Sequence, residues 1–472
     1  MFIGREKEVK ILNDNYKSDE SSFIAIYGRR RVGKTYLIRQ TFGDKILFSH
    51  TGMYQGNTKE QLDIFASSLK ESGLKDFDPP KNWIEAFDLL KDLVKKSSRE
   101  KKVLFIDELS WMDTPKSDLI KGLENFYNGW ASARNDVMLI ICSSVTSWIM
   151  NKVTHSKGGL YNRLTTGINL LPFTLKECEE YCNDNHLALT RKQIIETYMV
   201  IGGIPYYWNL FKKGESVSQF IDKCFFGENP QLSNELEYIF NSLFRKPADY
   251  FSIIKALSGK QIGLTRKEII NETKIIDNGQ FSGKLDDLIN CGFIREYYGY
   301  NKKSREIMYQ IIDPFTIFHF HFLTKKTYDS NFWENQINNP KINTWQGLAF
   351  ERICLIHHNC IKKSLGISGV STSIYPWKCS KDLDNGIYGS QIDMVIERKD
   401  DIINLIEIKY SSAKYVITKK YMDEIYKKKS DFVNKTHTRS AVHITFITLN
   451  GIEENSYSKE VQSFIDANDL FE

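Results

Sequence analysis

The stretch Gly28-Arg29-Arg30-Arg31-Val32-Gly33-Lys34-Thr35 matches the pattern G-x-x-x-x-G-K-[ST] at every fixed position. It follows the apolar run 23–27 and precedes residues 36–40, which have a helical pattern. Strand, glycine loop and helix in this order are typical of a loop that binds nucleoside triphosphates. The glycines let successive backbone N–H groups turn toward the phosphates, and the helix N-terminus adds partial positive charge there. The sequence therefore predicts a phosphate-binding loop.

The residue types of this loop predict specific contacts with a nucleotide. We expect the Lys34 ammonium to reach the β- and γ-phosphates and the Thr35 hydroxyl to ligand Mg²⁺. Upstream, Phe2 and Gly4 would give an adenine ring an apolar wall and a close backbone approach. The other candidate nucleotide-binding residues belong to the loop or follow it directly: Gly28, Arg29, Arg30, Arg31, Val32, Gly33 and Tyr36. The alternative is a glycine-rich turn with no ligand.

A second motif supplies the acidic residues that such a loop needs. The apolar run 103–106 ends in Asp107 and Glu108. Asp107 would hold Mg²⁺ through water, and Glu108 would polarise the attacking water, which favours hydrolysis over binding alone. The alternative is a strand that ends in a solvated acidic turn. Because the guanine-specific pattern N-K-x-D is absent, ATP is the expected nucleotide.

Two further residues are candidates for the same chemistry. The apolar run 137–142 ends in two serines, of which Ser144 would contact the γ-phosphate or the water. A serine cap on the next helix is the alternative. Arg163 follows a glycine pair and would reach a phosphate in its own or a neighbouring subunit, with a plain surface arginine as the equal alternative.

Length and composition limit the remaining possibilities. A chain of 472 residues with 41% hydrophobic residues should hold about three domains with ordinary cores. The net charge of +5 only weakly favours binding to polyanions. Eight scattered cysteines show no zinc-like spacing, whether at Cys178 and Cys182 or at His357, His358 and Cys360. No signal peptide or apolar run of membrane-spanning length is present, so we expect a soluble cytoplasmic protein without a membrane partner.

The middle of the chain has two helical patterns. Residues 173–240 are mostly helical and would form a small lid. In residues 241–325, three helical stretches precede two strands joined by the basic turn 299–305, which is typical of a winged helix. The third helix, 280–290, sets Lys284 against Asp286 and Asp287 and is poorly suited to phosphates. DNA contact through the wing and a purely structural role are equal alternatives.

Residues 330–472 contain a second set of charged residues on apolar elements. Glu351 lies on an expected helix, Asp393 interrupts the apolar strand 389–396, and Glu407 and Lys409 share one face of the strand 402–409. Buried charges are tolerated when they pair or bind metal. Asp393 and Glu407, with the carbonyl of Ile408, would form an oxygen site suited to Mg²⁺ or Mn²⁺, and Lys409 would orient an attacking water. The alternative is a structural Glu407–Lys409 ion pair.

This arrangement of an aspartate, then Glu-x-Lys, with a helical glutamate upstream resembles the PD-(D/E)XK nuclease superfamily. Ile392 stands where that name has proline. The resemblance implies that Glu351, Asp393, Glu407 and Lys409 are catalytic residues.

Nearly the whole chain resembles the archaeal-type ATPase family, a branch of the AAA+/STAND P-loop proteins. The shared landmarks are FIGREKEV at 2–9, YGRRRVGKT at 27–35, LFIDELSWM at 104–112, LIICSSVTSWI at 139–149, GLYNRLT at 159–165, GGIP at 202–205, IDMVIER at 392–398 and LIEIKY at 405–410. The resemblance implies ATP, Mg²⁺ and work on DNA. Ser143 and Ser144 depart from the asparagine that is usual at that strand end.

We therefore expect a multidomain α/β protein. Its parts would be a P-loop ATPase core at 1–172, a helical lid at 173–240, a winged helix at 241–325 and a mixed-sheet, restriction-endonuclease-like domain at 330–472. It would hydrolyse ATP and couple nucleotide state to DNA binding or to metal-dependent DNA cleavage. The rival is a nucleotide-dependent switch, scaffold or transcription regulator without nuclease activity. Further partners would be a second copy of the chain or another protein.

Overall fold

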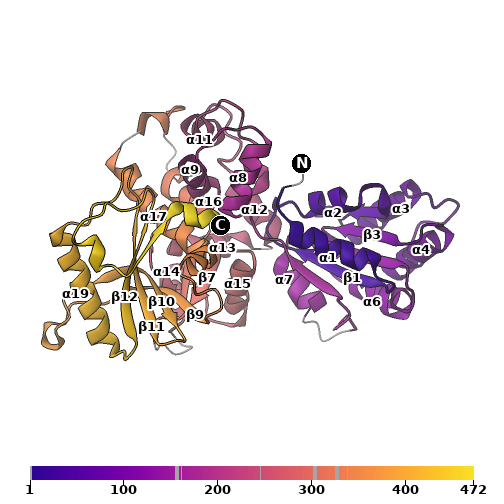
Figure 1. The fold of residues 1–472 in the computed structure, drawn as a ribbon. Helices are drawn as coiled ribbons and strands as arrows, with labels where there is room; N and C mark the ends of the chain where they lie inside the picture. Colours follow the sequence, from indigo (N-terminus) through magenta and orange to yellow (C-terminus); the bar gives the residue numbers. More distant parts are fainter. Residues whose placement is uncertain are drawn as a thin grey trace. The chain divides into compact units, whose positions relative to one another are not determined.

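The computed structural model describes residues 3–154, 159–160, 162–244, 246–300, 306–324, 329–336 and 339–472. The chain divides into two compact units, residues 1–172 and 173–472 (Figure 1). Among the described helices, none combines the length and the hydrophobicity that crossing a membrane requires.

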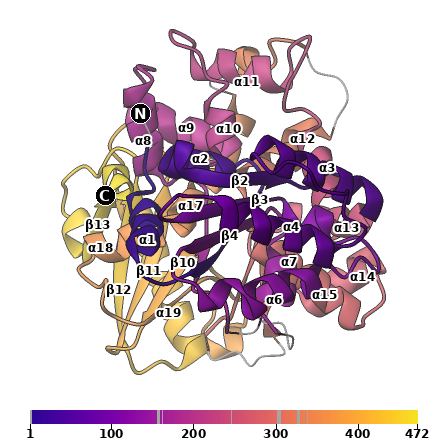
Figure 2. The same cartoon turned by 90° about the vertical axis from the view of Figure 1, so that its right-hand side faces the viewer.

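The first unit is built on a five-stranded parallel sheet with strand order β2-β3-β4-β1-β5. The buried strands β3 and β4 have continuous apolar runs, as expected for a parallel sheet covered on both faces (Figure 2). Because all strands point the same way, their carboxyl ends form one edge where functional loops meet. The strands are β1 (Ser22–Tyr27), β2 (Ile46–Thr51), β3 (Lys102–Asp107), β4 (Val137–Ser143) and β5 (Thr166–Asn169).

Helices cover both faces of this sheet, and their ends follow local capping chemistry. The Asn82 side chain accepts a hydrogen bond from Glu85 N and caps α4. The α6 helix begins after Asp118, which adopts a left-handed conformation, and it ends at Gly129, because Trp130 leaves the helical conformation. The helices are α1 (Glu6–Lys17), α2 (Lys34–Phe42), α3 (Thr58–Glu71), α4 (Trp83–Lys96), α5 (Leu109–Met112), α6 (Leu119–Gly129) and α7 (Thr146–Ile149).

The second unit begins with a group of helices. Gly203 lies between two of these helices, α9 and α10. Its backbone carbonyl accepts a hydrogen bond from Phe173 N at 2.6 Å. A Cβ at residue 203 would lie 1.9 Å from Phe173 O, so only glycine fits there. The helices are α8 (Leu175–Asp184), α9 (Arg191–Ile201), α10 (Pro205–Trp208), α11 (Val217–Phe225) and α12 (Glu235–Leu243).

A smaller group of helices and strands follows, which we call the 247–311 module. Its antiparallel sheet has the order β6-β8-β7. Two of the three charged residues of its third helix are engaged inside the module: Lys284 pairs with Asp249 at 3.2 Å, and Asp287 accepts from Tyr250 OH at 2.5 Å. Most of the basic turn, 301–305, lies outside the described residues. The elements are α13 (Pro247–Ser258), β6 (Leu264–Thr265), α14 (Arg266–Thr273), α15 (Gly279–Asn290), β7 (Ile294–Tyr297) and β8 (Met308–Ile311).

The chain ends in a second five-stranded sheet, of mixed type as expected, with strand order β13-β12-β11-β10-β9. The pairs among β9, β10 and β11 are antiparallel, and those among β11, β12 and β13 are parallel. Since parallel neighbours need a crossover, α19 joins β11 to β12. The strands are β9 (Thr372–Lys378), β10 (Gln391–Arg398), β11 (Ile402–Lys409), β12 (Ala441–Thr448) and β13 (Ser463–Asp466), and the helices are α16 (Pro314–Phe318), α17 (Pro340–Ile356), α18 (His358–Ser364) and α19 (Lys419–Thr436).

Candidate nucleotide site and C-terminal carboxylate site

The glycine loop joins β1 to α2 in the first unit, and backbone geometry explains its composition. Gly28 and Gly33 have φ angles of 142° and 96°, where side chains are strained. A Cβ on Gly28 would lie 2.3 Å from Leu170 O, so glycine lets the loop approach the chain that follows β5. Arg31 also has a positive φ, 70°. The α2 helix begins at Lys34, so its N-terminus faces the loop.

The Lys34 side chain is buried, and its ammonium lies inside the loop. Its Nζ donates to Gly28 O at 2.9 Å, to Arg29 O at 3.2 Å and to Ser144 Oγ at 3.1 Å. Burying an ammonium is costly unless acceptors surround it. A loop that holds a buried cation beside backbone N–H groups fits a phosphate chain.

The first candidate metal-binding pair joins the start of α2 to the end of β3. The Thr35 hydroxyl donates to Asp107 Oδ2 at 2.5 Å, and Glu108 N donates to Asp107 Oδ1 at 3.0 Å. Burial raises the pKa of Asp107, Glu108 raises it further, and Thr35 and Lys34 lower it. A hydroxyl and a carboxylate side by side near a phosphate loop are the oxygen ligands that Mg²⁺ prefers, so these residues fit the expected ion.

Ser144 links the lysine of the loop to Glu108. Its hydroxyl accepts from Lys34 and donates to Glu108 Oε1, while Ser144 N donates to Glu108 Oε2 at 3.1 Å. The N-cap of the next helix, α7, is Val145, so the serine does not cap it. Ser144 therefore orients the carboxylate that is expected to act on water.

We expect Ser144→Ala to lower the rate of ATP hydrolysis by about 10-fold, because one hydrogen bond to a charged group is worth about 1.4 kcal/mol or more. Steady-state phosphate release measures this effect. Ser143→Ala is the matched control, since the Ser143 hydroxyl contacts Ser110 and Val145 instead of the loop lysine. Equal rates in wild type and Ser144→Ala would show that the bridge has no catalytic role.

The remaining nucleotide candidates differ in exposure and in their contacts. Gly4 is buried with a φ of 62°, and Tyr36 is 54% exposed. Phe2 lies outside the described residues. Arg163 is exposed, and its N–H donates to Leu160 O. The electrostatic partner found for Arg163 is Tyr127, whose pKa it lowers against a larger increase from burial. Neither contact of Arg163 involves the nucleotide loop.

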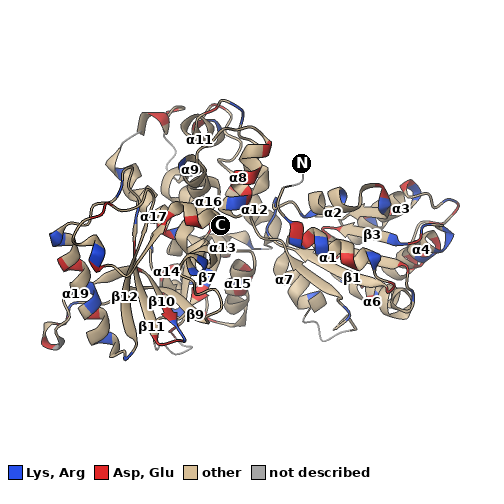
Figure 3. Cartoon of the chain, in the orientation of Figure 1, with Lys and Arg blue, Asp and Glu red and all other residues tan. Residues whose placement is uncertain are grey.

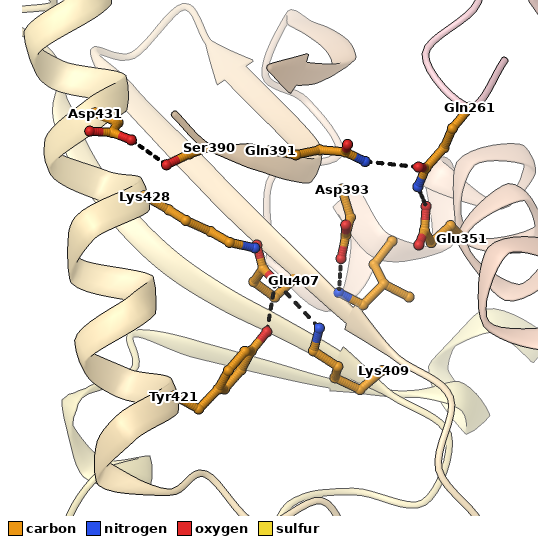
Figure 4. A network of polar contacts seen from close by, with 11 residues as sticks. Gln261, Glu351, Ser390, Gln391, Asp393, Glu407, Lys409, Tyr421, Lys428 and Asp431 are labelled. Atoms are coloured by element: carbon orange, nitrogen blue, oxygen red, sulfur yellow. Dashed lines mark hydrogen bonds and ion pairs between the residues drawn. The ribbon is translucent and has the colours of Figure 1, made fainter. Parts of the chain in front are cut away.

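In the second unit, β10 and β11 bring the C-terminal candidates to one place (Figure 4). Asp393 Oδ2 accepts from Ile408 N at 2.9 Å. The register of β10 on β9 shifts between Ile392 and Val395, so Asp393 lies at an irregularity of the ladder. Such bulges redirect side chains near functional sites. Glu351 approaches from α17, which packs against β11.

Glu407 is the most heavily engaged carboxylate of this cluster. Its side chain is 4% exposed, and it accepts from Lys428 Nζ at 2.7 Å, Tyr421 OH at 2.8 Å and Lys409 Nζ at 3.4 Å. A buried carboxylate is stable when paired in this way. Lys428 and Tyr421 come from α19, and sequence analysis missed both. They are seven residues apart and so lie on one helix face, which is the signal that could have identified them.

The other two carboxylates have perturbed acidities. Burial raises the pKa of Asp393 to about 6, with a further increase from Glu407. Burial also raises the pKa of Glu351 to about 7, and Asp393 adds to that shift. Two partly buried carboxyl groups whose charged forms are disfavoured would be stabilised by added positive charge.

The cluster fits a divalent cation only in part. Among the described residues, no group of three or more His, Cys, Asp and Glu side chains is arranged to hold a metal ion. The expected ligand set has two carboxylates, Asp393 and Glu407, and a carbonyl, Ile408 O. Both Glu407 oxygens already accept hydrogen bonds, so a cation at Glu407 would share these oxygens with the donors from Lys428, Tyr421 and Lys409.

The histidines and cysteines considered for zinc have other contacts. Cys178 and Cys182 are buried thiols on α8. His357 is buried, its Nδ1 hydrogen-bonds Ile353 O at 2.9 Å, and its Nε2 accepts from Leu175 N at 3.0 Å. His357 therefore satisfies a backbone donor at the start of α8 and holds two helices together.

This histidine predicts an acid-sensitive contribution to stability. Burial lowers the pKa of His357 to about 4 from 6.5. The contribution is complete above pH 6.5 and is lost as the pH falls towards 4, because the unfolded chain binds the proton first. The loss amounts to about 3 kcal/mol at most. Urea unfolding at pH 7 and pH 4.5 should show a smaller difference for His357→Gln than for wild type. An equal difference would contradict the prediction.

Comparisons with known proteins agree with the geometry of the first unit. Residues 2–211 match the model of a family described as an ATPase domain predominantly from Archaea. The match runs past Pro172 through α10. Residues 2–211 are therefore similar to an archaeal-type ATPase domain, and the glycine loop and the Asp107–Glu108 pair lie at the edge of the sheet within that stretch.

Individual relatives extend this result. An uncharacterised protein of Methanocaldococcus jannaschii is 24% identical over 440 residues, covering 91% of this chain and 92% of its own. An uncharacterised ATP-binding protein of the same organism is 40% identical over 45 residues, which is 10% of this chain and 76% of its own. The solved structure of a Walker-type ATPase of Pyrococcus abyssi has a TM-score of 0.50 at 17% identity and covers 68% of this chain and 96% of its own. The last comparison supports the fold alone.

Proposed function

We propose that this ATPase hydrolyses ATP at the Lys34–Asp107–Glu108 site and couples its nucleotide state to DNA through a nuclease-like C-terminal domain. The observation that carries the C-terminal part is the convergence of Asp393, Glu407 and Lys409 from neighbouring strands, with Glu351 facing them from α17 (Figure 4). The domain boundaries near residues 172, 240 and 330, and the winged-helix nature of the 247–311 module, belong to the same proposal.

At the nucleotide site, each residue has a distinct task. Lys34 complements the charge of the β- and γ-phosphates, and Glu108, oriented by Ser144, takes a proton from the attacking water. Mg²⁺ held by Thr35 and Asp107 would neutralise phosphate charge. Glu108 is the N-cap residue before α5 and has a left-handed backbone conformation. The turn at the end of β3 therefore sets the direction of its side chain.

At the C-terminal site, the residues present suit phosphodiester hydrolysis. A divalent cation held by Asp393, Glu407 and the Ile408 carbonyl would polarise a phosphate oxygen. Lys409, whose side chain is 26% exposed, is close enough to solvent to orient a water and to offset negative charge that develops on the phosphate. Glu351 adds negative charge beside Asp393.

The charge distribution around this site favours a polyanionic substrate. Exposed lysines occur on α19 and just before it, next to the helix face that contacts Glu407 (Figure 3). Lysines attract nucleic acid through phosphate contacts that carry no sequence preference. DNA is therefore the substrate class that we propose. The lysines concerned are Lys414, Lys419, Lys420 and Lys427.

One observation favours a second function, in which the C-terminal cluster is structural and not catalytic. Lys428, Tyr421 and Lys409 satisfy Glu407 without any cation. In that case the cluster would be a structural ion network, and the chain would be a nucleotide-dependent switch, scaffold or transcription regulator. It would bind DNA or a protein partner, including a second copy of itself, without cleavage.

Incubation of the purified full chain with linear and circular DNA separates these functions. ATP, ADP and no nucleotide are each combined with Mg²⁺, Mn²⁺ or a chelator, and product lengths are followed on gels. We expect cleavage that requires a divalent cation and the Asp393 side chain. Absence of cleavage in every combination, together with retained ATP hydrolysis, would favour the switch or scaffold.

A further inference from the structure

The turn between α13 and β6 brings one side chain of the 247–311 module to the C-terminal carboxylate cluster. This side chain is Gln261, whose Nε2 donates to Glu351 Oε2 at 2.6 Å. Its Oε1 accepts from Gln391 Nε2 at 2.9 Å. Gln391 lies two residues before Asp393 on β10. One carboxamide thus bridges the helix that carries Glu351 and the strand that carries Asp393 (Figure 4).

The backbone of this turn is held on both sides, which fixes the origin of the Gln261 side chain. Gln261 O accepts from Gln310 Nε2 at 2.6 Å, within the module, and from Arg352 of α17. Gly263 closes the turn with a φ of 93°, and a Cβ there would lie 2.1 Å from Tyr309 O. The turn is therefore packed against β8 and cannot shift without breaking contacts on two elements.

The chemistry of the bridge is specific for a carboxamide. The side chain donates to a carboxylate on one side and accepts from an amide N–H on the other, and a carboxamide carries both groups on one planar unit. A glutamate of equal length would place a second carboxylate beside Glu351. A methionine of similar length would leave the partly buried Glu351 without this donor, which is costly for a charged group.

We propose that Gln261 is a positioning residue of the C-terminal carboxylate site, which holds Glu351 beside Asp393, so that the 247–311 module completes the site. This inference rests on the proposed binding of a divalent cation by that cluster. Partners that orient the groups of a metal site commonly change metal affinity by about 10- to 100-fold when they are removed.

The test is titration calorimetry of the full chain with MnCl₂. We expect Gln261→Met to weaken Mn²⁺ binding by about 10-fold or more. Gln280→Met, on the exposed side of α15, is the matched control and should bind as wild type does. Gln261→Asn keeps the amide but shortens its reach, so it should also weaken binding. The shorter variant keeps the test decisive if the methionine variant fails to fold.

A double-mutant cycle distinguishes positioning from general damage. If Gln261 acts through Glu351, then Gln261→Met should cause no further loss of Mn²⁺ affinity in a Glu351→Gln background. A loss of equal size in both backgrounds would overturn the inference, as would unchanged affinity in both Gln261 variants. Failure of the wild type to bind Mn²⁺ in an Asp393-dependent manner would instead overturn the proposed function on which the inference rests.

Discussion

Glu108→Gln is expected to keep ATP bound while its hydrolysis falls by about 10²-fold or more. The amide preserves the size of the side chain and can still meet Ser144, but it is no longer a base for the attacking water. Lys34, Thr35 and Asp107 remain in place to bind the phosphates and the metal. Phosphate release measures turnover, and binding of a fluorescent ATP analogue measures affinity.

Lys34→Ala provides the contrasting variant, because it removes the charge that complements the phosphates. It should lose both affinity and turnover. Glu100→Gln, an exposed carboxylate before β3, is the control and should match wild type in both. Equal turnover in wild type and Glu108→Gln would remove Glu108 from the mechanism.

The nucleotide site could be predicted from sequence because its parts are local. The glycines at 28 and 33 are required by positive φ angles within one turn, and Asp107 and Glu108 follow directly from the end of a buried strand. Parallel strands then bring these segments to the same edge of the sheet. The sequence predicts a contact of Ser144 with the γ-phosphate or the water, but its bridge between Lys34 and Glu108 could not be predicted, since only the fold brings these two side chains together.

The C-terminal cluster shows the limit of the same reasoning. Alternation along β11 predicts that Glu407 and Lys409 share one face. The other partners of Glu407 come from α19, which begins ten residues after the end of β11. The contact of Gln261 with Glu351 spans 90 residues, and that with Gln391 spans 130. No periodicity encodes such contacts, because they arise when two modules pack together.

Lys409→Ala and Asp393→Ala should separate chemistry from metal binding at the C-terminal site. Lys409 is not an expected ligand, so its removal should retain Mn²⁺ and DNA binding and lower the rate of cleavage by about 10²-fold. Asp393 combines burial with an expected ligand role, so Asp393→Ala should lose both Mn²⁺ binding and cleavage. Glu351→Ala should have a smaller effect on cleavage than either. Calorimetry, gel-shift assays and cleavage rates measure the three properties.

Lys399→Ala is the matched control for this comparison. Lys399 is exposed in the turn between β10 and β11, at the opposite end of these strands from Lys409. It should leave metal binding and cleavage unchanged, because neither its charge nor its contacts reach the carboxylates.

The ion-network alternative makes the opposite prediction for Asp393→Ala and Lys409→Ala. Both variants would then lose thermal stability, and the wild type would show neither cleavage nor an Asp393-dependent Mn²⁺ site. That result would leave ATP hydrolysis as the chain's only enzymatic activity and make the C-terminal sheet a binding module.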